Sequence, residues 1–325
     1  MAITISGSGI TSANIADGTI TTDDILASDV KNLKSGRKNL IINGGFNVSQ
    51  RGDYTTATTA ADNVYYLDRF KAVTNGASAT VQHINNTTYN SLKMTATSTA
   101  SGTLGAISFL EEFQKGKTLT ASVRMKSNNS NARVLIYDGV SFLATSSTHT
   151  GDGSEEIITA TGVVSTSATL LRVYTTISTA GVGAVSITSG DYIEIAEVQL
   201  EVGSVATDFE HRSYGEELAL CQRYYQKISS NGLVYTTYST TQGYMQVPTP
   251  VQMRVLPSIS WNIVDRVALA STSNITTNIT YWSSYSNSPS SFFSFQARSS
   301  VALTSGLTYV MFPTAVTYMA LNAEL

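Results

Sequence analysis

Residues 117–127 read KTLTASVRMKS, a stretch in which apolar and polar side chains alternate strictly. Leu119, Ala121, Val123 and Met125 take every second place, and residues two apart lie on the same face of a β-strand. One face of this strand is therefore expected to be buried and the other to be more open to solvent.

Runs of the same texture surround this stretch. SLKMTAT (91–97) and GAISFLEEF (105–113) precede it, while ARVLIYD (132–138) and DYIEIAEVQLEVG (191–203) follow it. Each run is bounded by Gly, Asn, Asp or Ser, which is typical of strands joined by tight turns. Strands with little helix between them pair antiparallel, so the sequence predicts an all-β protein with a jelly-roll β-sandwich over residues 39–212.

A short linking helix is predicted over residues 213–227, SYGEELALCQRYYQK. Ser213 can cap this helix, and Glu216, three residues later, completes a capping box. Strand-like runs then return, and residues 228–325 are predicted to form a smaller C-terminal β-sandwich.

The first 38 residues differ from the rest of the chain. Ile10, Ile15, Ile20 and Ile25 recur every five positions, a spacing that fits neither a helix nor a strand. One apolar residue in five cannot bury a core, so we expect residues 1–38 to be an extended arm whose isoleucines are covered by a partner. The alternative is a flexible terminus.

Composition excludes several functional classes. Charged residues make up 13% of the 325 residues, against a usual share of about 25%, and the net charge is −3. This charge is too weak for electrostatic capture of nucleic acid. The single cysteine, Cys221, rules out an intrachain disulfide. We see no signal peptide and no apolar run of about 18 residues, so no membrane insertion is expected.

No catalytic, metal or cofactor motif is evident in the sequence. The three histidines are far apart and lack metal-ligand spacing, and neither a GxSxG elbow nor a P-loop is present. Glycoside hydrolysis needs two carboxyls about 5 to 9.5 Å apart, whereas neighbouring strand residues such as Glu155 and Glu156 point to opposite faces. Carboxyls from distant segments stay open as an alternative. We predict a protein that is not an enzyme.

The strongest binding signal is aromatic. The segment YWSSYSNSPSSFFSF (281–295) sets rigid rings among small polar residues, as adaptable recognition loops do. The alternative is that these rings pack in a core or between subunits. The candidate ligand-binding residues are Tyr281, Trp282, Tyr285, Phe292 and Phe293.

Several stretches resemble bacteriophage tail-fibre proteins. They are NLIINGGFNVSQRG (39–52) with YYLDRF (65–70), VQLEVGSVATDFEHRSYGEELALCQRYYQK (198–227), YMALNAEL (318–325) and the arm ITSANIADGTITTDDI (10–25). The first resembles the start of a jelly-roll domain that is similar to carbohydrate-binding modules.

The resemblance implies a homotrimer that contacts host-surface glycans. It also implies structural roles: Asn43, Gly44, Gly45 and Phe46 would shape a turn at the core edge, while Gln222, Arg223 and Tyr224 would dock the helix between domains. The ligand-facing residues would lie outside these motifs.

The resemblance thus implies a virion fibre protein, which we expect to be assembled in the host cytoplasm and released by lysis. Its expected partners are other tail or capsid proteins, bound through the arm, and host polysaccharide or lipopolysaccharide. Two alternatives stay open: a structural capsid decoration, head fibre or connector without a receptor, and a glycan depolymerase.

Overall fold

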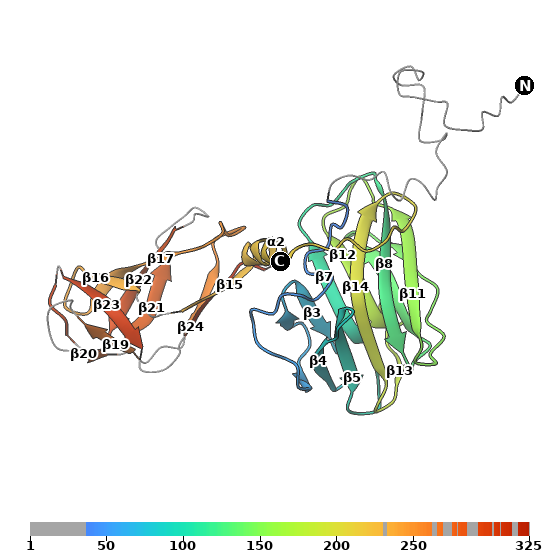
Figure 1. Ribbon diagram of the computed structural model, residues 1–325, viewed down its shortest axis with the longest axis horizontal. Helices are drawn as coiled ribbons and strands as arrows, with labels where there is room; N and C mark the ends of the chain where they lie inside the picture. Colours follow the sequence, from blue (N-terminus) through green and yellow to red (C-terminus); the bar gives the residue numbers. More distant parts are fainter. Residues whose placement is uncertain are drawn as a thin grey trace, which may run out of the picture.

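A computed structural model describes most of the chain beyond the arm. The described residues are 37–229, 233–261, 265–268, 275–277, 279–284, 292–300, 302–305, 307–313 and 318–324. Within them the chain is almost entirely β, with one α-helix (Figure 1), so the predicted fold class is confirmed.

The first part of the chain is a sandwich of two six-stranded antiparallel sheets. We call the first the β8 sheet; it has the strand order β1-β4-β5-β14-β8-β11. Its strands are β1 (Thr58–Ala60), β4 (Ala79–Asn85), β5 (Asn90–Ala96), β8 (Thr118–Ser127), β11 (Glu155–Val163) and β14 (Tyr192–Val202).

The second sheet has the strand order β10-β9-β12-β7-β3-β2. Its strands are β2 (Tyr65–Leu67), β3 (Phe70–Val73), β7 (Leu104–Leu110), β9 (Ala132–Tyr137), β10 (Phe142–Thr145) and β12 (Leu171–Ile177). A small pair, β6 (Ala100–Gly102) and β13 (Val185–Ile187), completes this part of the fold.

Alternation along β8 produces the buried face expected from the sequence. Leu119, Ala121, Val123 and Met125 are all fully buried in the core between the two sheets. Full burial of each larger apolar side chain contributes about 1.5–3 kcal/mol. Arg124, at an alternating position, stays partly exposed on the other face, and this outer face of the β8 sheet carries the site described below.

The C-terminal part has its own core and two further sheets. The three-stranded sheet has the order β15-β24-β18, and the seven-stranded sheet has the order β20-β19-β23-β16-β17-β22-β21. The strands are β15 (Tyr225–Ser229), β16 (Val234–Thr237), β17 (Gln242–Pro248), β18 (Ser258–Trp261), β19 (Asp265–Ala268), β20 (Ile275–Thr277), β21 (Ile279–Ser284), β22 (Phe292–Ser299), β23 (Thr308–Pro313) and β24 (Tyr318–Asn322).

The linking helix is shorter than the sequence predicts. It is α2 (Tyr214–Gln222), and the Ser213 hydroxyl caps it by accepting a hydrogen bond from the backbone N–H of Glu216 at 3.3 Å. The prediction that the helix runs to residue 227 is wrong, because Tyr225 begins β15 and pairs with Asn322 of β24. Pairing with a distant strand therefore overrides the local helical spacing.

Two arginines of the jelly roll and the end of β24 form a buried contact between the two parts, which we call the joint. Glu324 makes ion pairs with Arg51, at 3.0 Å, and with Arg69. The Arg51 guanidinium lies 3.9 Å from the ring centroid of Tyr225, and the Arg69 guanidinium lies 3.5 Å from the ring centroid of Tyr224. Figure 1 shows β15 and β24 running together toward α2 at this point.

A buried acid lies next to the joint. The Asp68 carboxylate accepts hydrogen bonds from the backbone N–H of Gln50, at 2.7 Å, and from its side-chain amide, at 2.9 Å. The same amide donates to the Tyr225 carbonyl at 2.9 Å, so Asp68 is linked to β15 through Gln50. Burial raises the pKa of Asp68 to about 6.

Among the described residues, no helix has the length and apolar character needed to span a bilayer.

Candidate functional site

A β-bulge in β14 shapes the outer face of the β8 sheet. The register between β14 and β8 shifts between Ala196 and Gln199, and Glu197 within the bulge has a left-handed φ of 49°. Non-glycine residues rarely adopt this conformation, and bulges are used to re-aim side chains. Val198 is fully buried, while the neighbouring Glu197 reaches Arg124 on the outer face.

The turn at residues 43–46 holds this bulge in place. The backbone N–H of Val198 donates to the Gly44 carbonyl at 2.9 Å, and the Asn39 amide donates to the Val198 carbonyl at 3.1 Å. A Cβ at Gly44 would lie only 2.0 Å from the Val198 carbonyl oxygen, so the close approach requires glycine.

The other residues of this turn anchor it to the jelly roll. The backbone N–H of Phe46 donates to the Asn43 carbonyl at 2.9 Å, and the buried Phe46 ring lies 4.7 Å from that of Phe70. The Asn43 amide donates to the carbonyls of Val48 and Asp68. Gly45 lines the hollow described below.

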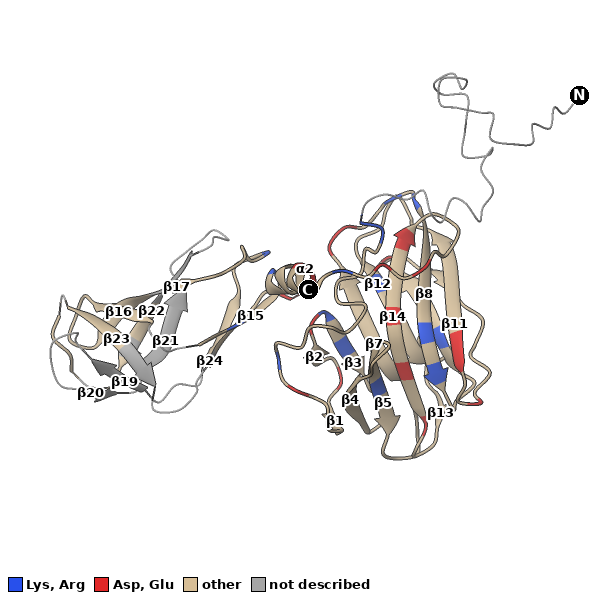
Figure 2. Ribbon diagram, viewed as in Figure 1, with Lys and Arg blue, Asp and Glu red and all other residues tan. Residues whose placement is uncertain are grey.

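Arg124 is the centre of a charged cluster on this face. Its Nε donates to the Glu197 carboxylate at 2.8 Å, and its guanidinium also pairs with Glu155 of β11. Lys126 lies 3.6 Å from Glu155, and the Tyr89 hydroxyl donates to the same carboxylate. Figure 2 shows these basic positions on β8 between acidic positions on β14 and β11.

These contacts keep the charges of the cluster fixed. The hydrogen bond from Tyr89, followed by that from Arg124, lowers the pKa of Glu155 below its ordinary value. The hydrogen bond to Glu197 raises the pKa of Arg124. Both groups are therefore ionised at neutral pH.

Two adjoining hollows beside this cluster form what we call the β8 groove. Their volumes are about 570 Å³ and 200 Å³, and both are lined by Glu197, Phe209 and His211. The larger is further lined by Arg124, Ile157 and Asp208 among others, and the smaller by Asn47, Tyr89 and Asn90 among others. The larger hollow is in the size range of small-molecule sites.

Ring faces and amides supply the recognition groups of the groove. The Phe209 and His211 rings meet edge-on, with centroids 5.1 Å apart, in the segment between β14 and α2. Tyr89 and Asn90 come from the β4–β5 hairpin, and the Asn90 amide donates to the Asn47 side-chain oxygen at 2.9 Å. Aromatic and amide groups from three distant segments therefore converge on one face.

Sequence reasoning did not identify this groove. The outward direction of Arg124 follows from the alternation along β8, but neither the bulge at Glu197 nor the approach of the hairpin carrying Tyr89 has a local signature. Phe209 and His211 belong to a stretch that the resemblance assigned a structural role only.

The aromatic site predicted from sequence is only partly within the described residues. Tyr281 and Trp282 belong to β21, and Phe292 and Phe293 to the neighbouring β22, where they pair with Pro248 and Val247. The side chains of these four residues lie outside what the structure describes, as does Tyr285 entirely. Ligand binding there stays a prediction.

The predicted arm and docking residues have different positions. Ile10, Ile15, Ile20 and Ile25 lie outside the described residues. At the end of α2, Gln222 accepts a hydrogen bond from the Gln226 amide through its carbonyl at 3.0 Å. Arg223 pairs with Glu111 at 3.3 Å, and the Tyr224 hydroxyl donates to the same carboxylate at 2.7 Å. Burial raises the pKa of Tyr224 to about 12.

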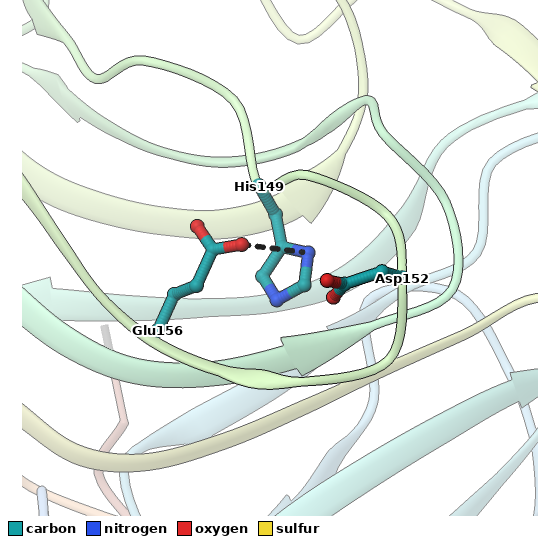
Figure 3. Close-up of side chains that lie close together, drawn as sticks. All are labelled: His149, Asp152 and Glu156. Carbon is teal, nitrogen blue, oxygen red and sulfur yellow. Dashed lines mark ion pairs between the residues drawn. The ribbon is translucent and has the colours of Figure 1, made fainter.

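His149 and Asp152, in the loop between β10 and β11, form a second cluster with Glu156 at the start of β11 (Figure 3). Their ligand-type atoms lie within 4.8 Å of one another, a spacing that could hold a metal ion. However, His149 Nδ1 accepts from the Gly151 N–H at 2.8 Å, while Nε2 lies 3.1 Å from the Ser154 carbonyl.

The two carboxylates of this cluster are also bonded to their own loop. Glu156 accepts from the Thr150 N–H at 3.0 Å, and Asp152 accepts from the Ser154 N–H at 2.8 Å. The Ser154 hydroxyl donates to Asp152 and the Thr150 hydroxyl to Glu156, and these hydroxyl hydrogen bonds, followed by those from the backbone N–H groups, lower the pKa of both acids. These hydrogen bonds account for the closeness of the three side chains. The predicted absence of a metal site stays a prediction.

Glu197, which lines the groove, and Glu155, which also pairs with Arg124 but does not line it, raise the question of glycoside hydrolysis. Such an enzyme protonates the leaving group with an acid whose pKa is raised. Glu155 has the opposite shift, and both Glu155 and Glu197 bind the Arg124 guanidinium. The arrangement fits ionised acceptor groups better than a general acid.

Comparison with known proteins gives no family. No known protein family and no curated protein matches the chain. A Bacteroides thetaiotaomicron protein proposed to bind sugars is 12% identical, with 51% of this chain and all of that chain covered, at a TM-score of 0.31. The CBM22 tandem of Paenibacillus barcinonensis Xyn10C is 10% identical, with 90% and 99% covered, at a TM-score of 0.30.

A third solved structure, Bacillus subtilis oxalate decarboxylase, is 9% identical, with 85% and 76% covered, at a TM-score of 0.16. With scores this low, neither ligand nor activity is transferred from these proteins to this chain.

Proposed function

We propose that this chain is a bacteriophage virion fibre protein, of the tail-fibre type, that contributes to the recognition of host-surface glycans without catalysis. The observation that carries the glycan-binding part is the β8 groove, in which Tyr89, Phe209 and His211 lie beside the Arg124–Glu197 pair. Rigid rings with small amides beside them suit sugars, which present apolar faces and hydroxyl edges.

The groove is built on rigid elements. The bulge that positions Glu197 is held by Gly44 and Asn39, and Arg124 is fixed by two carboxylates. A preformed site loses less entropy when a ligand binds, so even a small polar groove can bind selectively.

The fibre assignment rests on the resemblance of the motifs at both ends of the chain to tail-fibre proteins. In this proposal residues 1–38 attach the protein to tail or capsid proteins, and the chain assembles as a homotrimer in the virion. A trimer would present a weak sugar site three times, which raises avidity through effective concentration.

Binding to an array of bacterial polysaccharides and lipopolysaccharides tests the glycan-binding part, with the full chain displayed on beads at high valency. Tyr89→Ala and Phe209→Ala should each weaken binding at least tenfold, because each removes a ring face of the groove. Tyr214→Ala is the matched control, since Tyr214 is exposed on α2 and does not line the groove.

Absence of binding to every glycan on the array would contradict the recognition role, provided that circular dichroism shows folded protein. Release of oligosaccharide from a bound glycan would instead identify a depolymerase and contradict the non-catalytic part of the proposal.

A structural connector without receptor binding is the second candidate. The buried joint favours it, because Glu324, Arg51 and Arg69 fix the two parts of the chain to each other. Labelling of the C-terminal part in intact particles separates the two: an exposed distal label supports recognition, and a label enclosed between other virion proteins supports a connector.

A further inference from the structure

We infer that the β8 groove selects uncharged glycans and rejects those that carry carboxylate, sulfate or phosphate groups. This inference rests on the proposed function and names the class of sugar for that same groove. It follows from how the charged groups of the groove are already used.

Arg124, the arginine that lines the groove, already has two carboxylate partners. Arg124 pairs with Glu197 through Nε at 2.8 Å and with Glu155 through its terminal nitrogen. Neighbouring Lys126 lies 3.6 Å from Glu155. An anionic sugar would have to displace one of these carboxylates to gain a counter-ion, and that carboxylate would lose its contact with Arg124 in a partly buried place.

Lys38, at one end of this region, is occupied as well. Its ammonium donates to the Thr207 hydroxyl at 3.0 Å and to the Asp208 carbonyl at 2.6 Å. It does not line either hollow.

The lining itself is acidic rather than basic. Apart from His211, Arg124 is the one basic residue that lines the two hollows, and Glu197 and Asp208 are carboxylates. Asp208 is exposed to solvent at the groove. A negative group on a ligand would therefore meet like charge, a repulsion that dissolved salt weakens.

The remaining polar groups are neutral and suit hydroxyls. Asn47, Asn86, Thr88 and Asn90 line the smaller hollow. Amides and hydroxyls can both donate and accept, as sugar hydroxyls do, whereas an ionised acid accepts only. Together with the rings, these groups describe a surface for a neutral polysaccharide.

The test compares glycans that share a backbone and differ in charge, such as dextran with dextran sulfate and xylan with glucuronoxylan, on an array probed with the full chain. We expect the bound glycans to be neutral, with charged counterparts at least tenfold weaker at 50 mM salt. The difference should narrow at 500 mM salt, because exposed charges are then screened.

Tighter binding to the charged members would overturn the inference while leaving glycan recognition intact. Absence of binding to every glycan on the array would contradict both the proposed function and this inference.

Charge-removal variants give an independent readout. Glu197→Gln combined with Asp208→Asn should admit charged glycans that the native groove rejects, and Asp208→Asn alone, at an exposed position, should do so in part without risk to the fold. Glu112→Gln is the control, because it removes an exposed carboxylate that does not line the groove. No gain of charged-glycan binding in either groove variant would contradict electrostatic rejection.

Discussion

The Arg69 guanidinium lies over the ring of Tyr224, 3.5 Å from its centroid, and pairs at the same time with Glu324. Arg69 is 1% exposed, so its buried charge is stabilised by this stack, by the Glu324 carboxylate and by a hydrogen bond that it donates to the Phe109 carbonyl at 2.5 Å. The residue belongs to the jelly roll, whereas Tyr224 and Glu324 flank the strands of the C-terminal part. The joint is thus a single buried charge arrangement shared by both parts.

Replacement of Glu324 by glutamine should destabilise the protein strongly. The change leaves two buried arginines without their anion, and loss of one partner of a buried ion pair costs about 3–5 kcal/mol. Denaturant unfolding measures the change. Glu216→Gln is the control, because Glu216 pairs with the exposed Arg37 and should cost less than about 1 kcal/mol. Equal effects of the two variants would mean that the joint contributes no more than a surface pair.

Gly44→Ala should damage both stability and the groove. The added Cβ would lie 2.0 Å from the Val198 carbonyl oxygen, so the turn must move away from the bulge that carries Glu197. We expect a loss of about 1–3 kcal/mol, as for overpacked sites, with weaker glycan binding.

The matched change for this prediction is Gly215→Ala in α2, where an added Cβ meets nothing within 4 Å. It should be neutral or stabilising by up to about 1 kcal/mol, since alanine favours helix. Thermal unfolding and array binding are measured on both; if Gly44→Ala behaves like Gly215→Ala, the turn does not support the bulge.

Asp68 should make stability depend on pH in a predictable direction. Burial raises its pKa to about 6 in the folded protein, above the ordinary value of 3.8, so the folded state binds this proton more tightly. The contribution of protonated Asp68 to the stability of the folded protein is fully present below pH 3.8 and is lost as the pH rises through about 6.

Asp68→Asn removes this titration. Between pH 4 and pH 7, the unfolding free energy of the native protein should fall by a few kcal/mol relative to that of the variant. Unfolding curves at several pH values test this, and a difference that is constant over the range would refute the assignment.

Cys221 should be unreactive in the folded protein. Burial, aided by the negative charge of Asp68, raises the pKa of its thiol well above the ordinary value, and the side chain is fully buried. Thiols react as thiolates, so a thiol reagent at pH 8 should label native protein no faster than it unfolds and denatured protein at once. Rapid labelling under native conditions would show that α2 opens from the jelly roll.

The sequence predicts the class of fold well and the site poorly, for physical reasons. Alternation along 117–127 records which face is buried, and the buried Leu119 and Met125 follow it directly. The groove instead depends on a register shift at Glu197 and on contacts between residues more than 70 positions apart, such as Arg124 with Glu197. No local pattern encodes either. The predicted helix is too long for the same reason, because Tyr225 pairs with the distant Asn322 in a β-sheet.

Chain order gives the joint a consequence for biosynthesis. Glu324 follows every other described residue. The whole jelly roll can therefore leave the ribosome before the carboxylate that pairs with Arg51 and Arg69 has been synthesised. Domains generally fold as units during translation, with the N-terminal one first. The nascent protein therefore passes through a stage in which a folded sandwich carries Arg51 and Arg69 without their Glu324 partner, and the joint forms after β24 and Glu324 have been synthesised.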